Sequence, residues 1–363
     1  MKCGIVGLPN VGKSTLFNCL SNAKAQSANY PFCTIEPNLG TVSVPDTRLF
    51  ELEKLVNPER VLPAVVEIVD IAGLVKGASK GEGLGNQFLA NIRECEAIIH
   101  VLRCFDNGNI VHVEGSVDPL RDKEIIDIEL QLKDLETIGK AVDKAKKFIK
   151  SGKKEDILAY ETLQNLQKFV EDGKNAREFP VDDFTKSIID DVQLLTKKPV
   201  LYVCNVDENS IKNGNSWIGK IEEMAQKESA EVVVLAAQIE ADINELETFE
   251  ERQMFLEELG LEEPGVNRLI RKAYDLLKLQ TYFTAGVKEV RAWTIGQGWT
   301  APQAAGVIHT DFEKGFIRAE VIAYDDFVNY GSEAKVKEAG KMRVEGKEYI
   351  VKDGDIMHFR FNV

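Results

Sequence analysis

The chain has 363 residues, of which 44% are hydrophobic and 29% charged, and its net charge is -14. This length predicts two or three domains of ordinary globular composition. No apolar run approaches the roughly 18 to 20 residues that span a bilayer, so a membrane-spanning protein is excluded. The charge also argues against a wholly basic nucleic-acid binder. Residues 119–198 and 281–363 are nearly neutral, however, so we expect a polyanion to contact those parts.

The N-terminus runs directly into an apolar segment, Cys3–Val6, which we interpret as the first core strand. This leaves no room for a signal or transit peptide, so we expect a cytoplasmic location. The six cysteines form no CxxC pair, which indicates reduced thiols rather than a zinc site or a disulfide framework. Cys33 alone falls in a predicted mobile loop, where oxidant sensing is an open question.

A phosphate-binding loop of the GxxxxGK(S/T) pattern is predicted at Gly7-Leu8-Pro9-Asn10-Val11-Gly12-Lys13-Ser14-Thr15. It follows the expected first strand and precedes an apolar pattern of helical period. Glycines let the backbone curl so that successive N–H groups face the phosphates, and the helix N-terminus adds about half a positive charge. We expect Lys13 to contact the β- and γ-phosphates and Ser14 to ligate Mg²⁺.

A carboxylate for the same cation follows the second apolar strand, Val65–Val69. The run Asp70-Ile71-Ala72-Gly73 has the DxxG arrangement of switch GTPases, so we expect Asp70 to hold a Mg²⁺-bound water and the Gly73 N–H to bond the γ-phosphate. The glycine-rich segment 74–85 predicts a loop that rearranges. Thr34, in the proline-bounded loop 29–37, is the natural second hydroxyl ligand of Mg²⁺.

The base-reading motif NKxD of switch GTPases is altered in this chain. A third apolar strand, Pro199–Cys204, ends in Asn205-Val206-Asp207-Glu208. In NKxD the aspartate accepts hydrogen bonds from guanine, and Glu208 at that position is one methylene too long to repeat the contact. Adenine needs an acceptor for its N6 amino group and a donor for N1, which Asn205 and the backbone at Val206 could supply. The sequence therefore favours ATP over GTP, with a strand end that contacts no base as the alternative.

The next predicted strand, Val232–Leu235, leads into Ala236-Ala237. Small residues at this point allow the backbone to approach the base. We therefore include Ala236 among the expected nucleotide-binding residues.

The glutamine that follows DxxG in many switch GTPases, and orients the attacking water, is replaced by Leu74. Intrinsic turnover should then be slow, on the order of 10⁻⁴ to 10⁻² per second. His100 lies within the strand Ala97–Arg103, and we interpret it as a core residue. His112 follows a loop beyond the end of that strand, at the edge where doubly wound sheets bind ligands. It is the side-chain candidate for positioning water, with an ordinary surface histidine as the alternative.

The distance between DxxG and the altered NKxD motif indicates an inserted segment, residues 119–198, with almost no strand signal. Two stretches of heptad-like spacing, separated by Ser151-Gly152, predict an antiparallel helical hairpin, and a further helix is expected around 184–195. The positions with this spacing are Ile128, Leu132, Leu135, Val142 and Ile149, and then Ala159, Leu163, Leu166 and Val170.

Six lysines lie near the predicted turn of the hairpin, at Lys144, Lys146, Lys147, Lys150, Lys153 and Lys154. They form either a solvated face or a contact for RNA or ribosomal phosphates with salt-sensitive affinity.

From about Thr281 the pattern changes to short strands at 292–294, 316–321 and 357–361, the last after a turn at Lys352-Asp353-Gly354-Asp355. A small mixed β domain, residues 281–363, is predicted, with no acid-base or metal cluster. The nucleotide-binding domain is then assigned to residues 1–118 and 199–280, and the whole chain to the α/β class with a switch-GTPase-like P-loop sheet.

Taken together, these motifs resemble those of the YchF-type Obg-like ATPases, a translation-associated branch of the Obg family of P-loop proteins. The resemblance implies ATP hydrolysis in preference to GTP, a coiled-coil insertion, association with ribosomes or RNA, and a hydrophobic residue at the Leu74 position. It also implies that the C-terminal part is a TGS domain of β-grasp fold, whose signature resembles 308–316. The other matching segments are 7–15, 29–37, 70–86 and 205–208.

Three functions remain distinct at this point. The first is an ATP-driven switch that binds a translational partner, and the second is an RNA- or ribosome-binding protein in which nucleotide is mainly a stabilising ligand. The third is a small-molecule phosphotransferase, against which the DxxG motif argues. No contact with DNA or with a membrane is implied.

Overall fold

The computed structural model describes residues 1–22, 39–71 and 84–362. They form two compact units, one holding 1–22, 39–40, 68–71 and 84–268, and the other holding 41–67 and 269–362. The sequence analysis placed residues 41–67 in the nucleotide-binding domain, whereas the structure groups them with the C-terminal residues. Within the described ranges, no helix combines the length and the apolar character that a membrane span requires.

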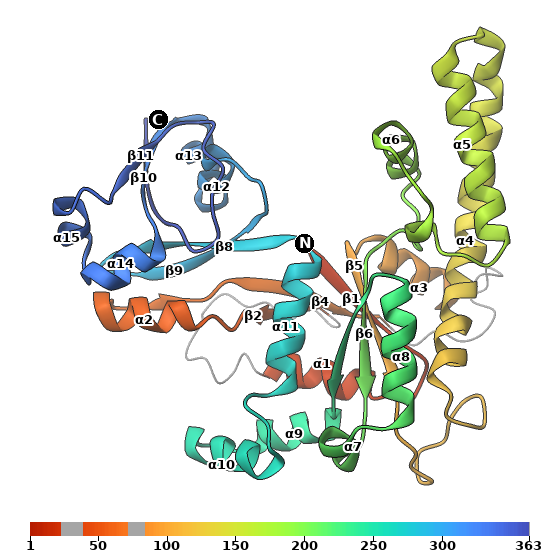
Figure 1. Ribbon diagram of the computed structural model, residues 1–363, viewed down its shortest axis with the longest axis horizontal. Helices are drawn as coiled ribbons and strands as arrows, with labels where there is room; N and C mark the ends of the chain where they lie inside the picture. Colours follow the sequence, from red (N-terminus) through yellow and green to blue (C-terminus); the bar gives the residue numbers. More distant parts are fainter. Residues whose placement is uncertain (23–38, 72–83, 363) are drawn as a thin grey trace. The chain divides into compact units, whose positions relative to one another are not determined.

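The nucleotide motifs lie on a sheet whose strands have the order β2-β4-β1-β5-β6-β7 (Figure 1). The pairs β1–β5, β5–β6 and β6–β7 are all parallel, and Val6, His100 and Tyr202 are aligned across the first three of these strands. Every residue of β5 and β6 is buried, as expected for central strands of a parallel sheet covered on both faces. The strands are β1 Lys2–Val6, β2 Leu39–Ser43, β4 Val65–Asp70, β5 Ala97–Arg103, β6 Val200–Asn205 and β7 Glu231–Leu235.

The helices around this sheet begin at residues that cap them. Asp207 accepts a hydrogen bond from the Ser210 N–H at the start of α7, and Asn215 accepts from two N–H groups at the start of α8. The helices are α1 Lys13–Asn22, α3 Leu84–Arg93, α7 Glu208–Asn213, α8 Ser216–Lys227, α9 Ala237–Glu245 and α10 Phe249–Leu259. The last helix before the C-terminal strands, α11 Gly265–Leu276, continues from this unit into the other.

The predicted helical hairpin is confirmed by α4 Pro119–Phe148 and α5 Lys154–Glu171, which project together from the sheet (Figure 1). Asp118 caps α4, and the chain reverses through a 3₁₀ turn, Ile149–Ser151, and Gly152 with φ of 70°. A further helix, α6 Asp183–Val192, lies in the expected place after a short 3₁₀ turn, Ala176–Glu178.

The predicted hairpin seam is only partly right. Leu166 and Val170 of α5 are buried in a cluster against which Leu135 and Val142 of α4 pack, as the heptad spacing suggested. The buried residue of α4 in this cluster is Ile138, which was not among the predicted positions. Ile128 and Leu132, however, are 52% and 44% exposed. Because α4 has 30 residues and α5 only 18, the first half of α4 packs on β5 and α8 instead, and a different face of the helix is buried there.

The C-terminal unit is the mixed β domain that the sequence predicted, with the strand order β11-β10-β12-β8-β9-β3. The strand pairs β8–β9 and β10–β12 are antiparallel, whereas β12 runs parallel to β8. Tyr282 packs between Trp293 and Phe359 in its core. Its elements are β3 Val61–Leu62, β8 Leu279–Ala285, β9 Val290–Gly296, β10 Phe316–Ile322, β11 Arg343–Glu345, β12 Ile356–Phe361, α2 Thr47–Val56, α12 Ala301–Ile308, α13 Thr310–Lys314, α14 Tyr324–Tyr330 and α15 Glu333–Glu338.

Residues 41–67 belong to this unit for two reasons. The short strand β3 extends the sheet by pairing parallel to β9, through Val61 and Leu62. The guanidinium of Arg48 on α2 bonds Asp353 at 2.6 Å. The turn predicted at 352–355 is present, because the Lys352 N–H bonds the Asp355 carboxylate at 2.9 Å.

Candidate nucleotide-binding site

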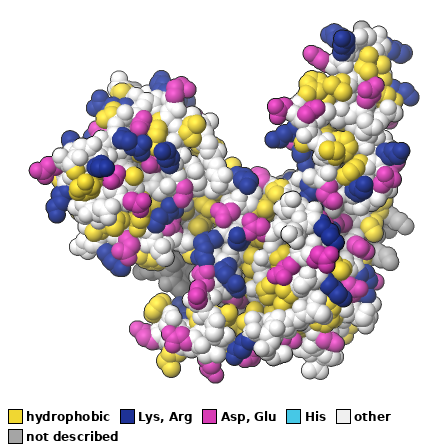
Figure 2. Space-filling view, in the orientation of Figure 1, with side chains coloured by type: hydrophobic (Ala, Val, Ile, Leu, Met, Phe, Trp, Pro, Cys, Tyr) yellow, Lys and Arg dark blue, Asp and Glu magenta, His cyan; other side chains and the backbone are white. Residues whose placement is uncertain are grey.

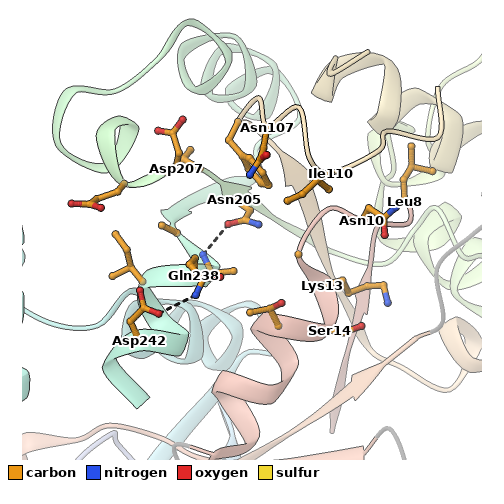
Figure 3. Close-up of a pocket in the computed structure, with 18 of the residues that line it drawn as sticks. Leu8, Asn10, Lys13, Ser14, Asn107, Ile110, Asn205, Asp207, Gln238 and Asp242 are labelled. Carbon is orange, nitrogen blue, oxygen red and sulfur yellow. Dashed lines mark hydrogen bonds between the residues drawn. The ribbon is translucent and has the colours of Figure 1, made fainter. Parts of the chain in front are cut away.

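A cavity of about 740 Å³ opens at the carboxyl ends of β1, β5, β6 and β7 (Figure 3). Parallel strands bring the residues that follow them to one edge of the sheet, which is where open α/β sheets bind ligands. In Figure 3, Lys13 and Ser14 lie on one side of the cavity and Gln238 and Asp242 on the other, with Asn205 between them. The lining residues are Leu8, Pro9, Asn10, Gly12, Lys13, Ser14, Thr15, Phe105, Asn107, Ile110, Asn205, Val206, Asp207, Glu208, Ala236, Ala237, Gln238, Ile239 and Asp242.

The phosphate-binding loop has the conformation that its sequence requires. Asn10 and Gly12 have positive φ angles of 64° and 94°, which turn the backbone back on itself before α1 begins. A Cβ on Gly12 would lie 2.2 Å from Nδ2 of Asn205, so a glycine is needed for space as well as for conformation. The first turn of α1 then presents the N–H groups of Lys13, Ser14 and Thr15 at a helix N-terminus, the ordinary site for an anion.

Lys13 is paired with the carboxylate that follows β4. Its Nζ lies 3.0 Å from Oδ1 of Asp70, and the two side chains are 9% and 15% exposed. The structure therefore brings the two predicted phosphate and Mg²⁺ residues into direct contact. Thr34 and Gly73, and with them Cys33 and Leu74, lie outside the described residues.

The oxygen donors at this position fit Mg²⁺. The exposed Ser14 hydroxyl and the Asp70 carboxylate are hard ligands, and Mg²⁺ in nucleotide sites usually takes one or two protein groups together with phosphates and water. The described residues contain no cluster of three or more His, Cys, Asp or Glu side chains that could enclose a metal ion. A cation at this site would therefore depend on the nucleotide for most of its ligands.

Asn205 joins three segments at the floor of the cavity. Its Nδ2 donates to the Val11 carbonyl oxygen at 2.8 Å, and its Oδ1 accepts from the Ala237 N–H at 2.9 Å. The side chain is only 4% exposed. These contacts differ from the adenine-reading role predicted for Asn205, because its amide is already used to hold the phosphate-binding loop against the start of α9.

The backbone at Val206 is similarly engaged. Its N–H donates to the Leu235 carbonyl oxygen at 2.9 Å, so it is not the donor that the sequence analysis assigned to adenine N1. Asp207 caps α7, whereas Glu208 is exposed at the cavity wall. Ala236 lies in the wall as expected. Of the predicted base-reading residues, Glu208 is the one that is exposed in the cavity lining.

Two polar residues of the wall were missed by sequence reasoning. Gln238 donates through Nε2 to Oδ1 of Asp242 at 2.9 Å, and both lie in the first turns of α9. Their position directly after β7 was the available signal, because residues that follow a parallel strand gather at the ligand edge. They add a polar surface opposite Lys13.

The third wall is a loop held by Arg103, another residue that was missed. Arg103 is the last residue of β5, and it is 1% exposed. Its guanidinium donates to the carbonyl oxygens of Phe105 at 3.2 Å, Ile110 at 3.1 Å and Asn107 at 3.3 Å. A guanidinium that donates to three carbonyl groups fixes the loop as one rigid piece beside the cavity.

His112 lies in the same loop but does not line the cavity. Its Nε2 is 2.8 Å from Oδ2 of Asp122 on α4, and its Nδ1 accepts from the Glu114 N–H at 3.1 Å. In this conformation neither ring nitrogen is available to a water molecule. The geometry favours a histidine that anchors the loop to α4, so its action on the attacking water stays a prediction that requires the loop to move.

The buried histidine and the described cysteines match the expectations from sequence. His100 is fully enclosed, and desolvation lowers its pKa to about 4. Cys3, Cys19, Cys95, Cys104 and Cys204 are buried free thiols. Burial raises the pKa of Cys95 to about 11, which keeps its thiol protonated and unreactive at neutral pH.

Comparison with known proteins agrees with this geometry. A family model described as a 50S ribosome-binding GTPase matches residues 2–149, and the YchF GTPase C-terminal model, whose description is a protein of unknown function, matches residues 279–362. The ribosome-binding ATPase YchF of Haemophilus ducreyi is 58% identical over 100% of this chain and 99% of its own length. The protein of the same name from Bacillus subtilis is 54% identical, with 100% of both chains covered. The chain belongs to the YchF family.

A solved YchF structure shows the same fold. The Schizosaccharomyces pombe YchF GTPase superposes with a TM-score of 0.89 at 37% identity, covering 99% of this chain and 97% of that one. The resemblance inferred from the motifs is therefore confirmed over the whole length. The two bacterial YchF proteins are named ATPases and the yeast structure a GTPase. The base that this cavity accepts therefore has to be argued from the residues that line it.

Proposed function

We propose that this chain is a Mg²⁺-dependent nucleoside triphosphatase that hydrolyses ATP, in preference to GTP, to ADP and phosphate. The observation that carries the proposal is the contact between Lys13 and Asp70 at one end of a cavity whose other walls can surround a base. A phosphate-binding lysine and a cation-binding carboxylate are the two charges that phosphoryl transfer requires. The site is therefore preorganised for the triphosphate end of a nucleotide.

The residues of the chain have separable tasks in this reaction. Lys13 neutralises charge on the β- and γ-phosphates, while the N–H groups at the start of α1 hold the phosphate oxygens. Asp70 and Ser14 would hold Mg²⁺, which supplies further charge neutralisation when it is bound. Binding of a triphosphate gives Lys13 new anionic partners, and Asp70 is then free to face the cation.

The preference for ATP rests on the wall that faces the base. A GTPase places an aspartate where this chain has Glu208, and a longer carboxylate in the same place meets guanine with the wrong geometry. The Glu208 side chain is exposed in the cavity lining, where it can meet the base. If guanine binds beside a carboxylate that cannot pair with it, polar groups of the base are left unpaired, and such a loss changes discrimination between the two bases.

The deciding experiment is a competition titration. The purified protein is titrated with fluorescent analogues of ATP and GTP in the presence of Mg²⁺, and each is displaced by both unlabelled nucleotides. We expect a clear preference for ATP, and slow release of phosphate in a parallel hydrolysis assay. Equal or tighter binding of GTP would mean that Glu208 still reads guanine, and would contradict the base assignment.

We further propose that the nucleotide controls association with the ribosome or with structured RNA, in the cytoplasm. The relatives named ribosome-binding ATPases support this. The lysines of the hairpin turn, which are all exposed, support it independently. The C-terminal unit, which we assign as a TGS domain of β-grasp type, is the second candidate contact. Sedimentation with ribosomes should then depend on whether ATP or ADP is present.

A second function fits the same exposed lysines: an RNA- or ribosome-binding protein in which nucleotide mainly stabilises the fold. Replacement of Lys13 by Ala separates the two, because it removes a phosphate contact and leaves the hairpin unchanged. A nucleotide-controlled switch loses the difference between ATP and ADP in ribosome sedimentation. The alternative function predicts that the variant sediments with ribosomes as the wild type does.

A further inference from the structure

We propose that the free end of the α4–α5 hairpin binds RNA at an unpaired nucleotide, with Phe148 stacking on the base and the surrounding lysines contacting phosphates. This inference rests on the proposed association with RNA and names the kind of RNA that the hairpin selects. It is carried by the placement of one aromatic ring, which the sequence analysis did not single out.

The hairpin end is a projecting basic surface. All six lysines between 144 and 154 are exposed, and Figure 2 shows Lys and Arg side chains at the tip with hydrophobic side chains among them. Since α4 has 30 residues, its last turn lies roughly 45 Å from its first. A long macromolecular ligand can therefore reach the tip without meeting the nucleotide cavity.

Phe148 lies within this basic surface. It is the last residue of α4 and is 54% exposed. Lys144 is one helical turn before it on the same face of α4, and Lys147 is its neighbour in sequence. None of the ring stacking or cation–π contacts among the described residues involves Phe148, so its ring is not taken up by another aromatic or cationic side chain.

An exposed phenylalanine alone would mean little, because single apolar side chains are common on protein surfaces. Phe249, at the start of α10, is 73% exposed, but Glu250 and Glu251 follow it in the first turn of that helix. Phe148 differs because its near neighbours in the chain, Lys147 and Lys150, are basic. Lysines bind the phosphates of an RNA of any sequence, whereas the face of an aromatic ring is a surface on which an unpaired base stacks.

This combination distinguishes between forms of RNA. A base inside a regular duplex is stacked on its neighbours and cannot reach a protein ring, so the lysines alone would bind a blunt duplex. A loop or bulge offers both a phosphate backbone and an extruded base. The tip should therefore bind a stem with an unpaired loop more tightly than the stem alone. If the natural partner of the tip were an acidic protein segment, we would expect the two RNAs to bind equally.

The test compares two RNAs on the full-length protein. One is a hairpin with an adenine-rich loop, and the other is a blunt duplex of the same stem sequence, each followed by fluorescence anisotropy over a range of salt concentrations. Replacement of Phe148 by Ala should weaken loop binding about 10-fold and leave duplex binding unchanged. Phe148→Leu should behave like the alanine variant, and Phe148→Trp should retain the preference for the loop.

Two controls separate the ring from the charge. Phe249→Ala removes an even more exposed ring in an acidic setting and should leave both affinities unchanged. A variant with Lys144, Lys147 and Lys150 replaced by Gln should bind both RNAs more weakly. The slope of log affinity against log salt concentration should also fall by about 2, since each phosphate contact contributes about 0.7 for single strands.

The outcomes also distinguish this inference from the proposed function. One outcome is that the lysine variant loses RNA binding while the Phe148 variants bind the loop as the wild type does. In that case the stacking proposal is overturned, and the proposed association with RNA still stands. If the wild type binds neither RNA, the stacking proposal and RNA association both fail, while the hydrolysis assay still reports on the ATPase.

Discussion

At the scale of single residues, Asn205 shows how the side chain of a motif position can be engaged with the protein backbone. Both ends of its amide are used, one for the Val11 carbonyl group and the other for the Ala237 N–H. The phosphate-binding loop and the start of α9 are held in position by these two bonds. We therefore expect Asn205 to support binding of a nucleoside triphosphate whichever base it carries.

Replacement of Asn205 by Ala should lower the free energy of unfolding by about 2 to 4 kcal/mol, because two buried hydrogen bonds are lost and their partners are left unpaired. The substitution should also weaken the binding of ATP and of GTP by similar factors, since the loop that holds the phosphates loses its support. Urea unfolding and the nucleotide competition titration measure the two effects.

Glu208→Ala is the matched control for this prediction. Its side chain is exposed and lies at the cavity wall, so stability should change little while the ratio of ATP to GTP affinity changes. If Asn205→Ala instead changes the ratio of the two affinities at constant stability, Asn205 reads the base and the supporting role is wrong.

His100 gives the fold a pH dependence. Desolvation lowers its pKa from 6.5 to about 4, and its Nε2 has no hydrogen-bond partner. As the pH falls from 6.5 to 4, the unfolded chain takes up a proton at this position that the folded chain does not. Stability is therefore fully present above pH 6.5 and decreases on acidification, by up to about 3 kcal/mol.

Replacement of His100 by Phe should remove this part of the pH dependence, because the ring is kept and the titrating nitrogen is lost. Urea unfolding at several pH values between 4 and 7 compares the two proteins. Near neutrality their difference should be constant, and below pH 6.5 the variant should become progressively more stable relative to the wild type. Parallel curves over the whole range would show that His100 titrates normally in the fold.

Residue types at motif positions were predictable, but the partners of those residues were not. The sequence identified Lys13, Ser14 and Asp70 because phosphate and Mg²⁺ chemistry restricts these positions to few residue types. Arg103 was missed because its role depends on three carbonyl groups of a loop, and carbonyl groups have no sequence signature. Asn205 was assigned to the base for the same reason, since its bonding partners are backbone atoms.

At the scale of elements, the loop after β5 is held between the phosphate-binding loop and the hairpin. Nδ2 of Asn10 bonds the Val111 carbonyl oxygen at 3.2 Å, and the next residue, His112, bonds Asp122 in the first turn of α4. A change at the phosphate-binding loop can thus reach α4 through two adjacent residues. Movement of this loop would both release His112 and shift the base of the hairpin.

His112→Ala should slow ATP hydrolysis without weakening ATP binding, if its imidazole positions the attacking water after the loop moves. It should also lower the free energy of unfolding by about 1 to 3 kcal/mol, because the buried Asp122 carboxylate loses a partner. Single-turnover hydrolysis, nucleotide titration and urea unfolding measure the three effects.

Asp122→Asn is the control that separates chemistry from anchoring. It weakens the same loop contact but keeps the imidazole. A slow His112 variant beside a normal Asp122 variant would identify the imidazole as the group that acts on water. Equal slowing in both variants would show that the loop position matters, and an unchanged rate in His112→Ala would remove this residue from the mechanism.

The helices also show where periodicity alone was misleading. Leu163, Leu166 and Val170 of α5 were placed correctly because α4 is the main partner of that helix along its length. Ile128 and Leu132 were placed wrongly because α4 changes partner halfway, from β5 and α8 to α5. A single heptad pattern cannot describe a helix whose neighbours change.

At the scale of the whole molecule, the hairpin is attached to the sheet by a buried network of charges. Glu228, at the end of α8, contacts Lys123 of α4 and accepts hydrogen bonds from Arg177 at 2.9 Å and from the Tyr202 hydroxyl on β6 at 2.7 Å. Lys123 also pairs with Asp127 at 2.8 Å. Two cations and two anions balance one another here, so these contacts join the base of the insertion to the nucleotide-binding sheet.

The division of the chain into units was the least predictable feature at this scale. The sequence analysis followed chain continuity and kept residues 41–67 with the nucleotide motifs. Their attachment to the C-terminal sheet depends on β3, which has only two residues and pairs with a strand far along the chain. So short a strand has no periodicity to detect, whereas the longer strands β9, β10 and β12 were found from their apolar patterns.

Nucleotide binding should change the stability of the entire protein. A ligand that binds only the folded state stabilises it by RT ln(1 + [L]/Kd), about 2.7 kcal/mol at 100 times Kd. Mg²⁺ and ATP together should therefore raise the Tm of the unit that contains the cavity. Removal of Mg²⁺ with EDTA should abolish most of this rise, because the phosphates then face the Asp70 carboxylate without a cation between them.

Lys13→Ala should show little rise under either condition. Lys212 is an exposed lysine of α7 outside the cavity lining, so Lys212→Ala is the control that should behave as the wild type. A full rise in the presence of EDTA would show that Asp70 does not bind the cation, and would leave Lys13 as the charge that holds the phosphates.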